Sequence, residues 1–390
     1  MNPQPILILS ASAGAGHTVA ARAIEAAVRR LAPAETVEVH DLLQSTNGLF
    51  SRLYANGYLG LARHAPTILG LIYESTDHPR PVADVLRRAF QHANSAGARR
   101  YVLHKRPKLI INTHFYSAEV VARLRCAGRL NCPQVTVTTD FDTHRMWVQP
   151  PTERYYAATT DGKDYLAILG VPPDNIKVTG IPIRPSFALD VDRAAFRARH
   201  GFDARRPLVL LLGGGFGVGP TEALFRQLLD LRRDVQIAAI AGRNEPLRRR
   251  LERAAVGARH PVRVIGFTDE MHAWMRSVDL AVSKPGGLTA SEALCCGLPL
   301  LIVYPIPGQE TRNSDYLLEQ NAAIKVNNYR MLARRVENLL DDRARLARLR
   351  SAGLAVARPN AAEEIVADAL QLIGWRPPAA TREPELVQRA

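Results

Sequence analysis

The stretch SKPGGLTASEALCCGLPLLIVYPIPGQE, residues Ser283–Glu310, decides the fold of this chain. It follows the apolar run Leu280–Val282 and contains a second apolar run, Leu300–Tyr304, and both are typical of buried strands. Between them, Pro285 and two glycines form a turn from which a helix begins. The helix ends at Gly297, because the proline two residues later cannot continue it. Strand, glycine turn, helix and strand in this order indicate an α/β protein with a parallel sheet.

The glycine turn is a candidate anion site. Gly286 and Gly287 allow close backbone approach, and the helix start leaves backbone N–H groups without partners. Glu292 on the first turn and the pair Gln309–Glu310 after the second strand are able to accept hydrogen bonds from hydroxyl groups, and this combination fits a nucleotide sugar. For the glycines alone, the simpler interpretation is an ordinary strand–turn–helix.

Composition and charge limit the classes of partner. The 390 residues are enough for two domains, and the formal charge of +14 indicates an anionic partner. Residues 48–110 alone carry ten Lys and Arg against three Asp and Glu. Because these basic residues accompany an apolar stripe and no recognisable nucleic-acid-binding module, we expect an anionic phospholipid surface as partner, and no nucleic acid.

The sequence also predicts where in the cell the protein is found. No apolar run approaches the roughly 18–20 residues that a membrane-spanning helix needs. The opening residues lack the features of a signal peptide, and the four cysteines lack metal-ligand spacing. We therefore expect a cytoplasmic protein that is peripherally associated with the inner face of the cell membrane.

The chain divides into two similar halves. A strand, a glycine-rich loop and a helix open the first half at residues 5–31, and the same order recurs at residues 208–231. The first loop, SASAGAGH, lacks the Lys-Ser/Thr pair of a phosphate-binding P-loop. A turn that presents His17 at the carboxyl edge of the sheet is the better interpretation, because ligands bind at that edge in open α/β folds.

Polar side chains follow three strands of the first half. In addition to His17, His114 follows the strand Leu109–Asn112, and the cluster Asp140–His144 follows the strand Gln134–Thr139. None of the spacings is that of a zinc site. A solvated loop explains any one of these groups, but three strand ends together favour an acceptor-side active site.

The segment 48–72 combines apolar and basic residues at helical spacing. A basic amphipathic segment with aromatic residues is typical of an interfacial membrane contact, although a core-facing helix with a solvated basic side fits the same pattern. The candidate membrane and acceptor contacts here are Phe50, Leu53, Tyr54 and Tyr58.

Several motifs together resemble a known family. The second half contains GGGFG, GFTDEM, SKPGGLTASEAL, GLPLLIVYPIPGQE and Asn313 in the order found in family 28 glycosyltransferases of the GT-B fold. The first half, with SASAGAGHTVAARAI and VTTDFDTHRMWVQP, is similar to the monogalactosyldiacylglycerol synthases and the bacterial diacylglycerol glucosyltransferases. The resemblance covers roughly residues 5–375; the motifs are specific as a group, and each is weak alone.

The resemblance implies two Rossmann-like doubly wound domains that face each other across a cleft. The expected units are residues 1–180 for acceptor and membrane binding, 181–355 for the nucleotide sugar, 356–375 as a closing helix that packs back toward the first domain, and 376–390 as a flexible tail. The donor contacts that it implies are Gly214, Gly215, Phe216, Arg243, Asn244, Phe267, Thr268, Pro285, Gly286, Gly287, Leu288, Thr289, Glu292, Gln309, Glu310 and Asn313.

The implied activity is inverting transfer of a hexose from UDP-galactose or UDP-glucose to the sn-3 hydroxyl of 1,2-diacylglycerol. His17 is the first candidate for the base and Asp140 the second, as base or orienting group; His17 could instead contact only the donor diphosphate. His114, Asp142 and His144 complete the acceptor side. No metal or cofactor is expected, because helix-start N–H groups and basic side chains can stabilise the leaving UDP.

Alternatives stay open at this point. A UDP-sugar epimerase or a non-catalytic UDP-sugar sensor would use the same fold. The residues separate neither the two hexoses nor one round of transfer from several, and they leave the oligomeric state open.

Overall fold

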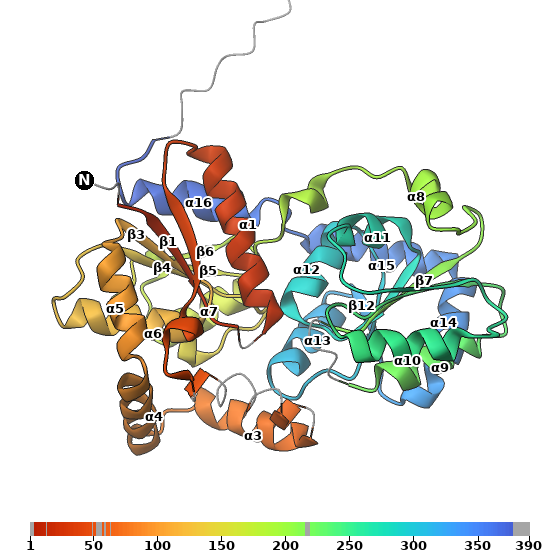
Figure 1. Ribbon diagram of the computed structural model, residues 1–390, viewed down its shortest axis with the longest axis horizontal. Helices are drawn as coiled ribbons and strands as arrows, with labels where there is room; N and C mark the ends of the chain where they lie inside the picture. Colours follow the sequence, from red (N-terminus) through yellow and green to blue (C-terminus); the bar gives the residue numbers. More distant parts are fainter. Residues whose placement is uncertain are drawn as a thin grey trace, which may run out of the picture.

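Two parallel sheets form the centres of two domains in the computed structural model (Figure 1). The structure describes residues 4–12, 14–48, 50–51, 57, 60–62, 64–214 and 219–376. Each sheet has six strands, with helices on both faces, which confirms the predicted α/β fold of two doubly wound domains.

The N-terminal sheet has the strand order β2-β1-β3-β4-β5-β6, and every neighbouring pair is parallel. Its central strands are buried along their whole length because helices cover both faces. The strands are β1 (Ile6–Ser10), β2 (Val37–Asp41), β3 (Leu109–Asn112), β4 (Gln134–Val137), β5 (Arg154–Ala157) and β6 (Ile176–Val178). Its helices are α1 (Ala15–Leu31), η1 (Leu42–Ser45), α3 (Pro66–Asp77), α4 (Pro81–Asn94), α5 (Ala96–Lys105), α6 (Phe115–Cys126), η2 (Arg145–Trp147), α7 (Thr160–Ile168) and η3 (Pro173–Asn175).

The C-terminal sheet has the order β12-β11-β10-β7-β8-β9 and is also parallel throughout. Its strands are β7 (Leu208–Leu212), β8 (Gln236–Ile240), β9 (Val262–Ile265), β10 (Leu280–Ser283), β11 (Leu300–Val303) and β12 (Ala323–Val326). Its helices are η4 (Pro185–Ala188), α8 (Arg193–Arg199), α9 (Thr221–Leu229), α10 (Glu245–Ala255), α11 (Met271–Ser277), α12 (Gly287–Cys295), α13 (Gln309–Glu319), η5 (Tyr329–Met331), α14 (Leu332–Asp341) and α15 (Arg343–Val356).

The last described helix, α16 (Ala361–Gln371), returns to the N-terminal domain and lies against α1 (Figure 1). Its apolar face joins the core formed by α1 and the first sheet. The buried Tyr156 hydroxyl donates to an Asp368 carboxylate oxygen at 2.9 Å, which fixes the helix to β5. The C-terminal helix therefore belongs to the N-terminal domain, although it follows the C-terminal domain in the sequence.

The two domains touch where α1 and α12 begin. Gly16 lies against Leu288, with 3.6 Å between the Leu288 Cβ and the position that a Cβ would take at Gly16. A Cβ added to Gly287 would overlap with the carbonyl oxygen of Thr139. The sequence pattern assigned Gly287, with Gly286, to an anion site. The structure adds a steric reason for Gly287, since only glycine lets β10 and its helix approach the first domain so closely.

This contact predicts a difference between neighbouring substitutions. We expect Gly287→Ala to lower the free energy of unfolding by about 1–3 kcal/mol, because the added methyl group overpacks the domain contact. Gly286→Ala is the matched control: its φ is −63°, and an added Cβ would have only Glu310 Oε1 within reach, at 3.8 Å. Denaturant unfolding of both variants measures the difference, and equal stability would contradict a steric role for Gly287.

Candidate functional site

The carboxyl ends of five strands surround the junction between the domains. From the N-terminal sheet, β1, β3 and β4 lead into His17, His114 and Asp140; from the C-terminal sheet, β10 and β11 lead into the starts of α12 and α13. Strand ends of parallel sheets collect at one edge, and here the two edges face each other. The structure therefore brings the predicted acceptor side and the predicted donor side together.

His17 lies in the first turn of α1 with its Nδ1 fixed by two partners. The carbonyl oxygen of Thr113 lies 3.0 Å from Nδ1, and the hydroxyl of Thr139 lies 2.8 Å from it. A carbonyl can only accept, so Nδ1 carries the ring proton and Nε2 keeps its lone pair. Burial lowers the pKa of His17 to about 4, against the opposing effect of the Thr113 carbonyl. The imidazole is therefore neutral at pH 7, in the tautomer that a general base needs.

His114 and His144 are buried and occupy N-cap positions. Each accepts a hydrogen bond at Nδ1 from a backbone N–H two residues later, at 3.0 Å from Tyr116 and 3.1 Å from Met146. The His114 ring lies 4.5 Å from that of His17, edge to face. Burial, and then the neighbouring His17, hold the pKa of His114 well below its ordinary value. These contacts give both histidines a structural position; their predicted contact with the acceptor stays a prediction.

Asp140 joins the two domains. One carboxylate oxygen accepts from Gln309 Nε2 at 2.6 Å and the other from Asn313 Nδ2 at 2.9 Å. The Asn313 side-chain oxygen in turn accepts from the Phe141 backbone N–H at 2.8 Å. Burial raises the pKa of Asp140 to about 6, although the two amide donors act in the opposite direction. A buried carboxylate with a pKa near neutrality is typical of a functional site.

Glu292 is buried on α12 and is the least satisfied carboxylate at the junction. No described residue donates a hydrogen bond to it, and Arg184 is the cation that acts on it. Burial raises its pKa to about 8. A buried carboxylate is costly unless hydrogen-bonded, so this group is suited to a ligand that brings hydroxyl donors.

Lys284 also lies at the junction and is a candidate site residue that the sequence interpretation missed. Its Nζ lies 3.2 Å from Glu310 Oε1, and a Cβ at Gly214 would lie 3.5 Å from its Cε. Glu310 also accepts from the backbone N–H of Ile306 at 2.8 Å. Lys284 is the basic residue of the stretch Ser283–Glu310, and its place directly before the glycine turn is the signal that could have identified it.

The remaining donor candidates follow the next strands of the C-terminal sheet. The Arg243 guanidinium lies 4.7 Å from the ring centre of Phe267, whose side chain is exposed. Asn244 caps α10 by accepting from the Leu247 backbone N–H at 3.0 Å. The Thr268 hydroxyl accepts from the backbone N–H of Glu270. An exposed aromatic ring beside a cation offers a stacking surface for a base.

Other predicted residues separate into three groups. Pro285 is buried, and Leu288 and Thr289 are half-buried at the start of α12. Phe50 is buried, with its ring centre 6.0 Å from that of Tyr116, so in this structure it is a core residue and offers no membrane contact. Leu53, Tyr54, Tyr58, Gly215 and Phe216 lie outside the described residues.

The described part of the chain has neither a candidate metal site nor a candidate membrane-spanning helix. It contains no group of three or more His, Cys, Asp or Glu side chains placed to hold a metal ion. Its helices include none that is both long and apolar enough to cross a bilayer.

Comparison with known proteins gives the same division into two parts. The family described as monogalactosyldiacylglycerol (MGDG) synthase matches residues 17–183, and the family described as glycosyl transferases group 1 matches residues 193–355. A solved UDP-GlcNAc 2-epimerase from Neisseria meningitidis, bound to UDP-GlcNAc, shares the fold with a TM-score of 0.58 at 12% identity, over 94% of this chain and 99% of the other.

Curated relatives match over both domains. A processive diacylglycerol beta-glucosyltransferase of Staphylococcus carnosus is 32% identical over 317 residues, 80% of this chain and 78% of the relative. A protein of the same name from Bacillus licheniformis is 29% identical over 369 residues, 94% of both chains. With two facing Rossmann-like domains and this extent of similarity, the chain belongs to family 28 of the glycosyltransferases, in the group of monogalactosyldiacylglycerol synthases and bacterial diacylglycerol glycosyltransferases.

Proposed function

We propose that this glycosyltransferase moves glucose from UDP-glucose to the sn-3 hydroxyl of 1,2-diacylglycerol, giving a β-glucosyl diacylglycerol. The observation that carries the proposal is the similarity to diacylglycerol beta-glucosyltransferases over both domains, combined with the facing strand ends of the two domains. The names of the relatives favour glucose over galactose and also favour repeated transfer to the glycolipid product.

The donor fits the C-terminal side of the junction. Glu292 would accept hydrogen bonds from the ribose hydroxyls, which would satisfy its buried carboxylate. The uncapped start of α12 and the Lys284 ammonium would hold the diphosphate. Gln309 and Glu310, at the start of α13, would hold the sugar next to Asp140. Phe267 would offer its exposed ring to the uracil.

The transfer itself needs a base on the face of the sugar opposite UDP. His17 Nε2 would take the proton of the acceptor hydroxyl as that oxygen attacks the anomeric carbon and the bond to UDP breaks. The negative charge of the bound diphosphate would raise the pKa of His17 from its low value and make it a stronger base. Asp140 would orient Gln309, and hence the sugar. The helix-start N–H groups and Lys284 would stabilise the leaving UDP, so the proposal requires no metal and no cofactor.

The pH dependence separates the two candidate bases. The profile of kcat/KM reports the free protein, so we expect activity to fall as pH drops below about 6, where Asp140 becomes protonated. In Asp140→Asn this limb should move toward pH 4, the pKa of His17. His17→Ala should lose about 10²–10⁴-fold in kcat, the usual contribution of a general base.

Initial-rate measurements from pH 4 to pH 8 on the three proteins check this assignment. A limb that stays at the wild-type position in Asp140→Asn, or full activity of His17→Ala, would contradict it.

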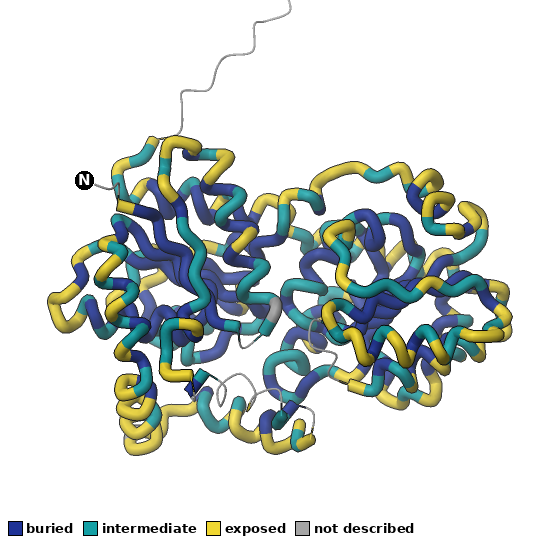
Figure 2. Tube along the Cα trace, in the orientation of Figure 1, coloured by how far each residue is buried: buried dark blue, intermediate teal, exposed yellow. Residues whose placement is uncertain are grey.

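The acceptor would reach the site from a membrane surface formed by α3 and α4. Val82, Val85, Leu86 and Phe90 form one exposed apolar face of α4, and Figure 2 shows exposed residues along both helices. A hollow of about 130 Å³ beside α4 is lined by Arg87, Arg88 and Arg145, among other residues. Apolar side chains beside arginines fit an anionic bilayer surface, which supports peripheral association with the inner face of the cell membrane.

Sedimentation with vesicles containing anionic phospholipid tests this surface. We expect Leu86→Asp to weaken binding by about ten- to hundredfold, since burying a leucine side chain contributes about 1.5–3 kcal/mol. Val256→Asp, on the C-terminal domain and at a residue that is even more exposed than Leu86, is the matched control and should bind like the wild type. Binding that resists high salt, or equal loss in both variants, would contradict the assignment.

Incubation of the wild type with diacylglycerol in anionic vesicles and a panel of UDP-sugars tests the whole proposal. We expect a glycolipid with UDP-glucose, separated by thin-layer chromatography. An epimerase would convert the UDP-sugar without a lipid acceptor, and a sensor would bind it without turnover. The likeness to a solved epimerase supports the shared fold alone.

A further inference from the structure

Helix α3 has two faces with different surroundings. On its inner side, Leu69 is buried against Ile306, in the loop that leads to α13. On its outer side, Ile68, Leu71 and Ile72 are about half exposed or more. The helix therefore places an apolar surface on the outside and contacts the C-terminal domain on the inside, although it belongs to the N-terminal half of the chain.

The inner contact is close and leaves no room for larger residues. A Cβ added to Gly70 would lie 2.7 Å from Pro307 Cβ. A Cβ added to Gly308 would lie 2.7 Å from Tyr73 Cγ, and Gly308 has a φ of +88°, in the region that favours glycine. Both sides of the contact thus use glycine where α3 meets the loop before α13.

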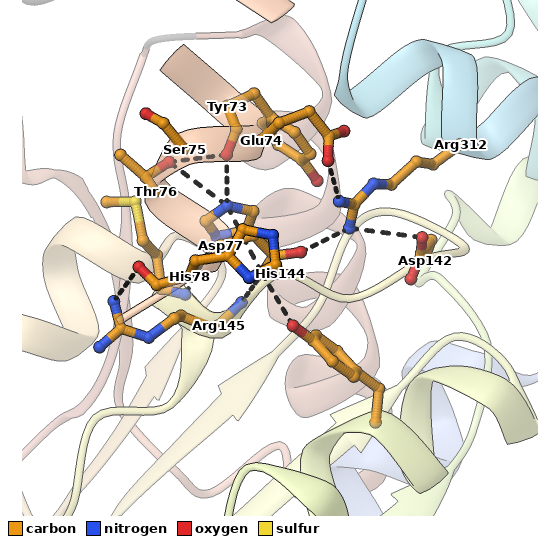
Figure 3. Close-up of polar contacts among 12 residues, drawn as sticks. Tyr73, Glu74, Ser75, Thr76, Asp77, His78, Asp142, His144, Arg145 and Arg312 are labelled. Carbon is orange, nitrogen blue, oxygen red and sulfur yellow. Dashed lines mark hydrogen bonds and ion pairs between the residues drawn. The ribbon is translucent and has the colours of Figure 1, made fainter. Parts of the chain in front are cut away.

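An arginine on α13 completes the contact. Arg312 Nη1 lies 2.7 Å from Asp77 Oδ2, and its Nη2 lies 2.8 Å from Glu74 Oε2. Its guanidinium also lies over the Tyr73 ring, 5.1 Å from the centre. Figure 3 shows Arg312 reaching from the second domain toward these α3 residues and toward Asp142, at 3.6 Å.

Asp77 ties this ion pair to the body of the N-terminal domain. Its buried Oδ1 accepts from the Arg145 backbone N–H at 2.9 Å (Figure 3). The same oxygen accepts from the Tyr165 hydroxyl at 3.1 Å. Burial raises the pKa of Asp77, but the Arg145 amide, the nearby His144 and Arg312 outweigh it and hold the pKa below its ordinary value. A buried pair with these additional hydrogen bonds is held far more rigidly than an ion pair on the surface.

The same face of α13 carries the donor-side contacts. Gln309, Arg312 and Asn313 stand at i, i+3 and i+4, so their side chains lie on one side of the helix. Gln309 and Asn313 hold Asp140, while Arg312 holds Asp77 and Glu74. One helix face therefore connects α3 with the end of α13 that we assign to the sugar.

We propose that Arg312 is a positioning residue: it ties the lipid-facing helix α3 to the sugar-binding end of α13, so that transfer requires α3 to be docked. The proposal rests on the proposed function. When Arg312 holds α3 against α13, the side chains of Gln309 and Asp140 are aligned for the reaction. When this tie is lost, donor binding persists through Glu292 and the start of α12, but the sugar end is misplaced.

Steady-state kinetics on vesicles with UDP-glucose, together with calorimetric binding of UDP, test the proposal. We expect Arg312→Gln to lower kcat by about 10- to 100-fold, as small displacements of reacting groups do, with unchanged affinity for UDP. Asp77→Asn should lower kcat similarly, and the double variant should lose no more than the worse single variant, because both remove one connection. Arg312→Lys, which keeps the charge, should recover part of the rate.

Arg125→Gln is the matched control. Arg125 forms a similarly half-buried pair with Glu153, 2.8 Å away, within the N-terminal domain and without contact to α13, so its kcat should stay at the wild-type value. A wild-type kcat in Arg312→Gln would overturn the proposal. Loss of UDP affinity in proportion to kcat, or loss of cooperative thermal unfolding in Arg312→Gln and Arg312→Lys alike, would also overturn it by showing a general structural role. Absence of glycolipid with the wild type would instead overturn the proposed function.

Discussion

The contact between Asp140 and the two amides of α13 is the interaction on which the rest of the structure depends. It lies at the carboxyl end of β4 and receives Gln309 and Asn313 from the other domain. Because both carboxylate oxygens are used, Asp140 links the carboxyl end of β4 firmly to the start of α13 in the other domain. Burial also raises the pKa of the Asp140 carboxylate to about 6. The group that joins the two domains therefore changes its charge close to neutral pH, as groups at functional sites often do.

Much of this arrangement could be predicted from the sequence, because glycine turns and apolar runs report local backbone constraints. The strand–turn–helix at Ser283–Glu310 and the matching opening of the first half gave the two parallel sheets. The family motifs also named Asn313, but the pattern did not reveal that its amide holds both the Asp140 carboxylate and the Phe141 backbone. Contacts between distant segments leave no periodic signal in the chain.

The histidines and glycines show why further details could not be predicted. A histidine after a strand reads as a candidate ligand or base, yet His114 and His144 are used as helix caps, which depends on local backbone geometry. The sequence pattern places Gly287 in an anion site. The structure shows a different reason for glycine at this position, because Thr139 of the other domain leaves no room for a side chain. Phe50 fits a membrane stripe by spacing but is buried, since spacing alone does not tell which side of a helix faces the core.

The central claim is that a base of the N-terminal domain and a donor on the C-terminal domain carry out a single displacement at the sugar. The anomeric configuration of the glycolipid product tests it most directly. Proton NMR of the lipid formed from UDP-glucose, whose sugar is α-linked, should show a β-glucosyl linkage, because attack from the face opposite UDP inverts the anomeric carbon. An α-linked product, or no glycolipid, would contradict the account.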